Sequence, residues 1–187
     1  MVACEGATEV AYLHQLRREL KISRQLATIE RAKGSDPEGV VAHAVRLRGA
    51  LNEKARRSES VRPDHAFAVF DREGPHDRAG LDAARVLAKR QGVAVLVSTP
   101  SFELWLLLHF ADCMRPLANS DEAMAALTVH CPTYRKGAAP LSSITACVAA
   151  AIERAQALDR HRTETAATGP GSDVFRLVQV LQRIAAG

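Results

Sequence analysis

Two continuous apolar runs of strand length, Ala66–Phe70 and Val93–Val97, constrain the fold more than any other feature of the sequence. Neither run contains a polar residue, as expected for strands that are covered on both faces. Between them, from Asp77 to Gly92, apolar residues recur at helical spacing. Buried strands joined by helices are typical of a parallel sheet with right-handed crossover connections.

The preceding part of the chain repeats this order of strand and helix. The apolar segment Met1–Cys4 predicts a short strand, and the pattern that begins at Thr8 predicts a helix. A second extended segment is predicted at Leu26–Glu30, and the Ser-Asp-Pro-Glu sequence from Ser35 predicts a helix that runs toward Arg57. We therefore predict an α/β fold with a mostly parallel four-stranded sheet flanked by helices.

The remainder of the sequence has a helical pattern. The predicted helices are a short, strongly apolar one at Phe102–Phe110, one from Asp121, one from Ser142 to about Leu158 and one from Ser172. The stretch Thr163–Gly171 is rich in Thr, Ala and Gly and predicts an exposed loop. Because 187 residues fit one ordinary domain, we expect residues 1–110 to form a core and residues 111–187 to be a helical extension packed on the same domain.

Charge and cysteine content exclude several classes of protein. The formal net charge of +4 permits a polyanionic partner without arguing strongly for one. The four cysteines form no CxxC pair, which argues against a zinc ribbon and a disulfide framework. No apolar run approaches the roughly 18 residues that a membrane span needs, so we expect a cytoplasmic protein without membrane contact.

Three acidic residues follow predicted strands: Glu5 after the first, and Asp71 and Glu73 after the third. The carboxyl ends of parallel strands lie along one edge of a sheet, where ligands bind. Carboxylates gathered there repel one another unless a cation is present, and Mg²⁺ (or Mn²⁺) prefers such oxygen ligands. Gly6 and Gly74, which follow the two acidic elements, allow a tight turn or close approach of a ligand. Solvated turn residues without a metal are the alternative.

Other charged residues are candidates around this site. Glu103 begins the helix after the fourth strand, where it either binds the metal or complements the helix dipole. Glu9 either leans back toward the site, in a supporting role, or pairs with a basic residue on the helix surface. Arg72, Arg135 and Lys136 are candidates for contact with a substrate phosphate.

Several reactive side chains have a structural interpretation that we prefer. His109 and Cys113 are spaced like two zinc ligands on one helix, but a second pair is missing, so packing is the simpler interpretation. Tyr12 and Tyr134 are conceivable nucleophiles, although tyrosines on a helix face or loop more often pack. Trp105 lies among leucines and is predicted to be in the core.

Five stretches of this sequence, in this order, resemble the RloB-like family and together span nearly the whole chain. The most specific of them is SFELWLLLHF, within Ser98–Phe110. The stretches are CEGATE (Cys4–Glu9), VFDRE (Val69–Glu73), STPSFELWLLLHF (Ser98–Phe110), TYRKG (Thr133–Gly137) and GSDVFRLVQVL (Gly171–Leu181).

The resemblance implies a Toprim-type, Rossmann-like fold, the parallel sheet with metal-binding acids of topoisomerases, primases and OLD-class nucleases. It also implies a metal-dependent nuclease in prokaryotic anti-phage defence, abortive infection or restriction loci, acting on DNA or RNA. Carried over by motif, Glu5 is the acid or base, and Asp71 with Glu73 is the metal pair. Toprim domains usually carry Asp where this chain has Glu73, and the third aspartate of the topoisomerase pattern falls at Pro75.

Two functions therefore remain open at this stage. The first is a Mg²⁺-dependent phosphodiesterase that hydrolyses nucleic acid. The second is a non-catalytic Toprim-like sensor or interaction module in a defence complex. A defence-system protein and a second copy of the chain, as a homodimer, are further candidate partners.

Overall fold

A computed structural model describes residues 1–59, 61–73, 78–136, 141–165 and 169–187 of the chain. The strands are β1 (Val2–Cys4), β2 (Ile29–Arg31), β3 (Phe67–Asp71), β4 (Ala94–Thr99) and β5 (Gly171–Ser172). The helices are α1 (Ala7–Glu19), α2 (Pro37–Arg56), α3 (Leu81–Gln91), α4 (Phe102–Leu107), α5 (Ser120–His130), α6 (Leu141–Thr145), α7 (Val148–Thr165) and α8 (Val174–Ala186).

The strands form a mixed five-stranded sheet in the order β2-β1-β3-β4-β5. β1 pairs in parallel with both β2 and β3, so that Val2 lies opposite Ile29 on one side and Phe67 on the other. β5 is antiparallel to β4. The predicted α/β fold with a mostly parallel sheet is confirmed, and β5 is an addition. Two residues are too few to show the alternation that predicts a strand.

The chain divides into two compact units. The first consists of Met1–Phe70, Ala79–Leu96 and Gln179–Gly187, and the second of Asp71–Arg78 and Val97–Val178. The predicted division at residue 110 stays a prediction.

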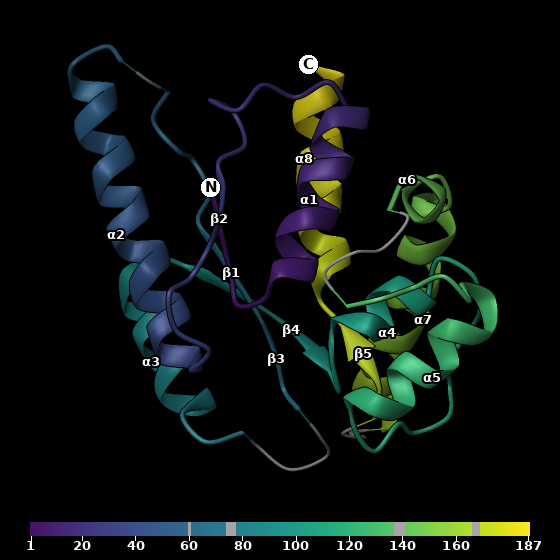
Figure 1. Cartoon of the computed structure of the whole chain (residues 1–187). Coiled ribbons are helices and arrows are strands. Elements are labelled where there is room, and N and C mark those ends of the chain that lie inside the picture. The colour runs from purple at the N-terminus through teal and green to yellow at the C-terminus, as the bar shows by residue number, and fades with distance from the viewer. Residues whose placement is uncertain (60, 74–77, 137–140, 166–168) are drawn as a thin grey trace. The chain divides into compact units, whose positions relative to one another are not determined.

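In the first unit, α1 and α2 lie on opposite sides of the strands β1–β3, and α3 lies beside α2 (Figure 1). Right-handed crossovers in the strand order β2-β1-β3 produce this arrangement. All three residues of β1 are buried, as a strand covered on both faces requires. Arg48 of α2 fixes the end of α3, because its guanidinium donates to the carbonyl oxygens of Gln91 at 2.6 Å and Gly92 at 3.1 Å.

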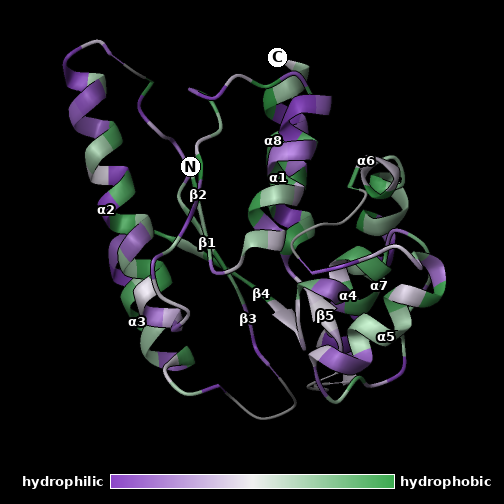
Figure 2. Ribbon diagram, viewed as in Figure 1, coloured by the Kyte–Doolittle hydropathy of each residue, from purple (hydrophilic) through white to green (hydrophobic). Residues whose placement is uncertain are grey.

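In the second unit, α4 packs against α5, α7 and β5 (Figure 1). All six residues of α4 are buried, including Trp105, which confirms the predicted core position of that side chain. Five of its six residues are apolar, and a helix with so little polar surface has to be covered on every side. Figure 2 shows the apolar colour along most of α4 and the change from apolar to polar residues at the end of β3.

Acidic and basic side chains connect β5 to its neighbours in the second unit. Asp173 forms two hydrogen bonds with Val97 of β4. Its amide donates to the Val97 carbonyl at 3.0 Å, and its carboxylate accepts from the Val97 amide at 3.2 Å. The Arg162 guanidinium lies 3.0 Å from Asp159 and 3.7 Å from Asp173. It lies so close to Gly171 that any side chain there would overlap it. A larger residue at this position would displace the Arg162 guanidinium from its place beside β5.

Several predicted boundaries differ from those observed, and each difference has a local cause. α3 begins at Leu81 instead of Asp77, after Gly80 with a left-handed φ of 82°. It ends as predicted at Gly92, whose φ of 60° suits a helix terminus. The predicted helix from Ser142 is two helices, of which α7 extends to Thr165 into the predicted loop. None of the helices within the described ranges combines the length and apolar composition that crossing a bilayer requires.

The start of α2 follows the predicted capping sequence. The Asp36 carboxylate accepts from the Gly39 amide at 2.6 Å, and Pro37 occupies the first helical position. We expect Asp36→Ala to lower the free energy of unfolding by about 1 kcal/mol, because that amide loses its acceptor. Urea denaturation measures the change, and Asp36→Asn, which keeps a capping oxygen, is the control. Equal losses in both variants would contradict a capping role.

Candidate functional site

The turn between β1 and α1 holds Glu5, Gly6 and Glu9, all in the first unit. Glu5 is half-buried and directly follows the carboxyl end of β1. Its amide donates to the Val69 carbonyl of β3 at 2.9 Å, which fixes its backbone beside β3. Gly6 is the N-cap of α1, and its amide donates to the Glu9 carboxylate at 3.1 Å. A side chain at Gly6 would overlap that carboxylate. Glu9 is only 4% exposed, so its predicted alternative place on the helix surface is wrong.

Burial of this turn also affects Cys4, the last residue of β1. Its thiol is fully buried, and burial, reinforced by the nearby Glu9 carboxylate, raises its pKa well above the usual value. A thiol in such surroundings stays protonated. Cys4 is therefore a packing residue next to the acidic turn.

The second acidic element, from Asp71 to Glu73, belongs to the second unit. The chain continues alongside β4 after Asp71, because the Arg72 amide donates to the Ser98 carbonyl and the Glu73 amide to the Pro100 carbonyl, both at 2.9 Å. Glu73, however, has a φ of 67°, in the left-handed region that residues other than glycine rarely adopt. In an extended segment residues 71 and 73 would project to the same side, but Glu73 leaves that conformation. Gly74 and Pro75 lie outside the described residues.

Arg78 is a residue of this segment that the sequence analysis missed. Its guanidinium donates to the Asp71 carbonyl at 2.8 Å and lies 3.4 Å from the Glu73 carboxylate. The Arg78 side chain is 12% exposed and that of Glu73 60%, so the arginine is the more buried partner of this pair. The positive charge of Arg78 thus offsets the charge of the Glu73 carboxylate, which the sequence analysis had treated as one of several unpaired acids. An arginine seven positions after Asp71 is a weak signal, because no sequence pattern links the two positions.

Glu103 is buried near the start of α4, with 2% of the residue exposed. Its carboxylate accepts hydrogen bonds from two hydroxyl groups, that of Ser101 at 2.7 Å and that of Tyr134 at 2.9 Å. Tyr134 itself is 1% exposed. The acid thus joins the start of α4 to the segment around Tyr134. This arrangement favours a packing role for Tyr134 over a role as nucleophile.

The predicted phosphate contacts Arg135 and Lys136 directly follow Tyr134, and both are exposed. The Arg135 guanidinium donates to the carbonyl oxygens of Tyr134 at 2.7 Å and Pro132 at 3.2 Å, which holds it against its own loop. The last residue of this motif, Gly137, lies outside the described residues. The role of Arg72, Arg135 and Lys136 toward a substrate stays a prediction.

His109 and Cys113 are 2% and 5% exposed, which favours their packing interpretation. The Nδ1 atom of His109 lies 2.9 Å from the Trp105 carbonyl, and since a carbonyl oxygen only accepts, Nδ1 carries the proton. Burial lowers the pKa of His109 to about 4 and raises that of the Cys113 thiol. Within the described ranges, no three His, Cys, Asp or Glu side chains are grouped so as to hold a metal ion.

Comparison with known proteins identifies one family. The family model described as RloB-like protein matches residues 1–181. Neither the curated proteins nor the solved structures gave a match.

Proposed function

Because this chain belongs to the RloB-like family, we propose that it is a divalent-metal-dependent nuclease that hydrolyses phosphodiester bonds of DNA or RNA. We further propose that it acts in the cytoplasm, in prokaryotic defence against phage. The observation that carries the proposal is the position of two acids. Glu5 directly follows β1, and Asp71 is the last residue of β3, the parallel neighbour of β1.

The donor atoms suit Mg²⁺ or Mn²⁺. Mg²⁺ commonly takes only one or two protein carboxylates and fills its other positions with water or substrate phosphate. A set of three preassembled protein ligands is therefore not required. Glu73 and Glu103 are predicted ligands with other partners, Arg78 for the first and two hydroxyl groups for the second.

A divalent ion, when bound, offsets the charge of a phosphate oxygen and makes a coordinated water more acidic. The protein's own groups would divide the remaining work. Asp71 binds the ion, and Glu5 accepts a proton from the attacking water or returns one to the leaving oxygen. The guanidinium of Arg78, once Glu73 moves aside, faces the phosphate that replaces this carboxylate.

The second candidate, a non-catalytic sensor in a defence complex, is favoured by one observation. Glu73, the second acid of the predicted metal pair, forms an ion pair with Arg78 and has a left-handed backbone conformation. Its carboxylate therefore already has a positively charged partner in place of a metal ion. A protein of this kind would keep the fold and the acids but bind no metal. A defence-system protein or a second copy of the chain would be its partner.

Metal binding tests the proposal directly. We expect the wild type to bind Mn²⁺ or Mg²⁺ in a calorimetric titration, and Asp71→Asn to bind at least about tenfold more weakly, since one anionic ligand is lost. Asp82→Asn is the matched control, because its side chain is 83% exposed at the start of α3. Indistinguishable titrations of wild type and Asp71→Asn would contradict the proposed site.

Cleavage assays separate the two candidate functions. Single- and double-stranded DNA, single-stranded RNA and tRNA are incubated with Mg²⁺ or Mn²⁺ and either wild type, Asp71→Asn or Glu5→Gln. The nuclease proposal predicts metal-dependent cleavage by wild type alone. A protein that cleaves none of these substrates with either metal at any dose would support the sensor.

A further inference from the structure

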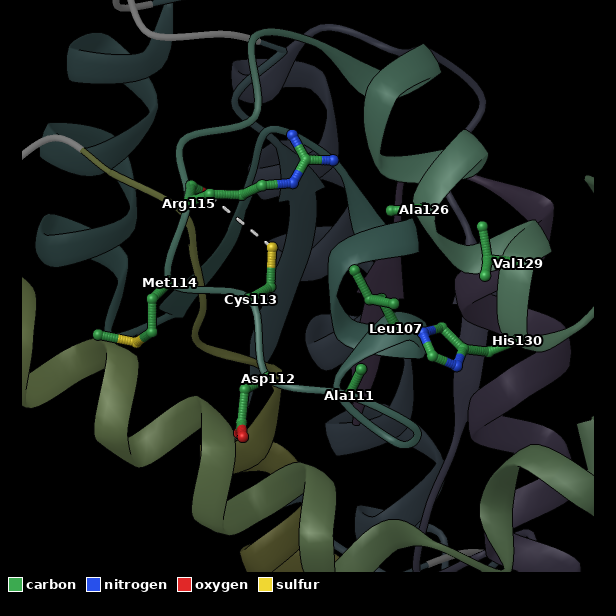
Figure 3. Close-up of a pocket in the computed structure, with 9 residues that line it drawn as sticks. All are labelled: Leu107, Ala111, Asp112, Cys113, Met114, Arg115, Ala126, Val129 and His130. Carbon is green, nitrogen blue, oxygen red and sulfur yellow. Dashed lines mark hydrogen bonds between the residues drawn. The ribbon is translucent and has the colours of Figure 1, made fainter.

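A cavity of about 530 Å³ opens within the second unit, between the segment that follows α4 and the helix α5. Its volume lies in the range of small-ligand sites. Figure 3 shows Cys113, Met114 and Arg115 on one side of it and Leu107, Ala126, Val129 and His130 on the other. None of these residues has a role in the proposed hydrolysis.

The walls of this cavity are largely apolar and accessible. Met114 is 52% exposed and Val129 is 76% exposed. These are two of the five large apolar side chains exposed among the described residues, and both line this one cavity. Exposed apolar side chains that gather at a concave site mark a place where another molecule is bound.

The polar groups at the rim favour an anion. Arg115 is exposed, and its guanidinium has no acidic partner among the described residues. The carboxylate that lines the cavity, Asp112, is paired with Arg154 at 3.2 Å. A cation without a counterion beside an apolar wall fits a ligand that carries both an apolar body and a negative charge.

A flat ring system completes the site. The imidazole of His130 is stacked on the phenyl ring of Phe110, with the two planes 3° apart and the ring centroids separated by 6.1 Å. Such ring pairs and guanidinium groups are the surfaces on which unpaired bases stack. A purely apolar side chain of a peptide would fill the cavity but would provide no negative charge for Arg115.

We propose that this cavity takes one unstacked base of a single-stranded nucleic acid, with the base against Leu107 and His130 and an adjoining phosphate on Arg115. The inference rests on the proposed function, since it supplies the nuclease with a site that selects unpaired strands. Base stacking tolerates any sequence, so the site selects strand form and not sequence.

The three methionines of the chain provide a direct probe. Full-length protein with ¹³C-labelled methionine methyl groups is titrated with short oligothymidylate or oligouridylate, in EDTA so that no metal chemistry takes part. A base in the cavity would shift the Met114 methyl resonance by its ring current. Met1 and Met124, which do not line the cavity, serve as internal references. An abasic strand of equal charge is the matched control ligand.

Two variants sharpen the titration. We expect Arg115→Ala and His130→Ala each to weaken binding of the base-bearing strand at least about fivefold. Arg160→Ala removes the same charge from an exposed position on α7 and is expected to leave that affinity within about twofold. A smaller effect of Arg115→Ala than of Arg160→Ala would overturn the inference.

The remaining outcomes separate this inference from the proposed function. A Met114 shift with base-bearing strands in a protein that cleaves nothing would support the cavity and contradict the nuclease. Cleavage of single strands without any Met114 shift would overturn the cavity and leave the nuclease. An equal Met114 shift with the abasic strand would also overturn the inference. A Met114 shift that grows with protein concentration alone would overturn it in favour of contact between two copies of the chain.

Discussion

Lowering the pH from about 7.5 to about 4 is expected to remove about 3 kcal/mol from the free energy of unfolding through His109 alone. The residue is 2% exposed, and burial lowers its pKa from the ordinary 6.5 to about 4. Between pH 6.5 and about pH 4, the His109 imidazole binds a proton in the unfolded chain but not in the folded protein. The contribution is therefore fully present above pH 6.5 and is lost as the pH falls toward 4.

The surroundings of His109 explain why it stays neutral. Burial has the largest effect on its pKa and lowers it, and the ring meets the Trp105 indole edge-on, with centroids 5.0 Å apart. The hydrogen bond from Nδ1–H to the Trp105 carbonyl raises the pKa, but by less than burial lowers it. The Arg154 charge nearby further disfavours a second positive charge, after the larger effect of burial. A protonated imidazole would have to leave this packed position or draw water into it.

A variant without a titrating group isolates this effect. His109→Asn retains an N–H donor for the Trp105 carbonyl and cannot become charged in this pH range. Urea midpoints measured from about pH 7.5 down to about pH 4 should fall less steeply for this variant than for wild type. The six other histidines are present in both proteins, so their contribution cancels in the difference. Parallel pH profiles would contradict the assignment to His109.

Tyr134→Phe is expected to lower the free energy of unfolding by about 2 kcal/mol. The substitution keeps the buried ring and removes only the hydroxyl that donates to the Glu103 carboxylate at 2.9 Å. Glu103 is only 2% exposed, so water cannot easily replace the lost bond, and the Ser101 hydroxyl already donates to the other carboxylate oxygen. An acceptor left unsatisfied in the interior bears the cost of its desolvation.

A double-mutant cycle attributes the cost to this pair. In a Glu103→Leu background, the Tyr134 hydroxyl has lost the same partner, so Tyr134→Phe should destabilise the protein by at least about 1 kcal/mol less than in wild type. Denaturant midpoints of the four proteins provide the coupling energy. Additive effects would show that Tyr134 and Glu103 do not stabilise each other.

The parts of the fold that could be predicted are those with a continuous pattern in the sequence. β3 and β4 are apolar for the length of a strand, and the Asp36 cap and Gly92 mark helix ends by residue type alone. Strand order placed Glu5 after β1 and Asp71 at the end of β3. The RloB-like family was likewise predictable, because its motifs are contiguous stretches.

The parts that could not be predicted depend on contacts between residues distant along the chain or on backbone angles. No residue pattern predicts the left-handed φ of Glu73 or its pairing with Arg78. The bond between Glu103 and Tyr134 joins positions 31 residues apart. Whether Glu5, Asp71 and Glu73 hold a metal remains a prediction.

β5 has a consequence for the behaviour of the protein in concentrated solution. This strand is the outermost of the sheet on its side and is two residues long. An outer strand exposes unpaired amide and carbonyl groups to which a neighbouring molecule can add a strand, and such addition begins aggregation. A strand this short, with Arg162 and Asp173 beside it, has too few free groups to start a growing ribbon of chains.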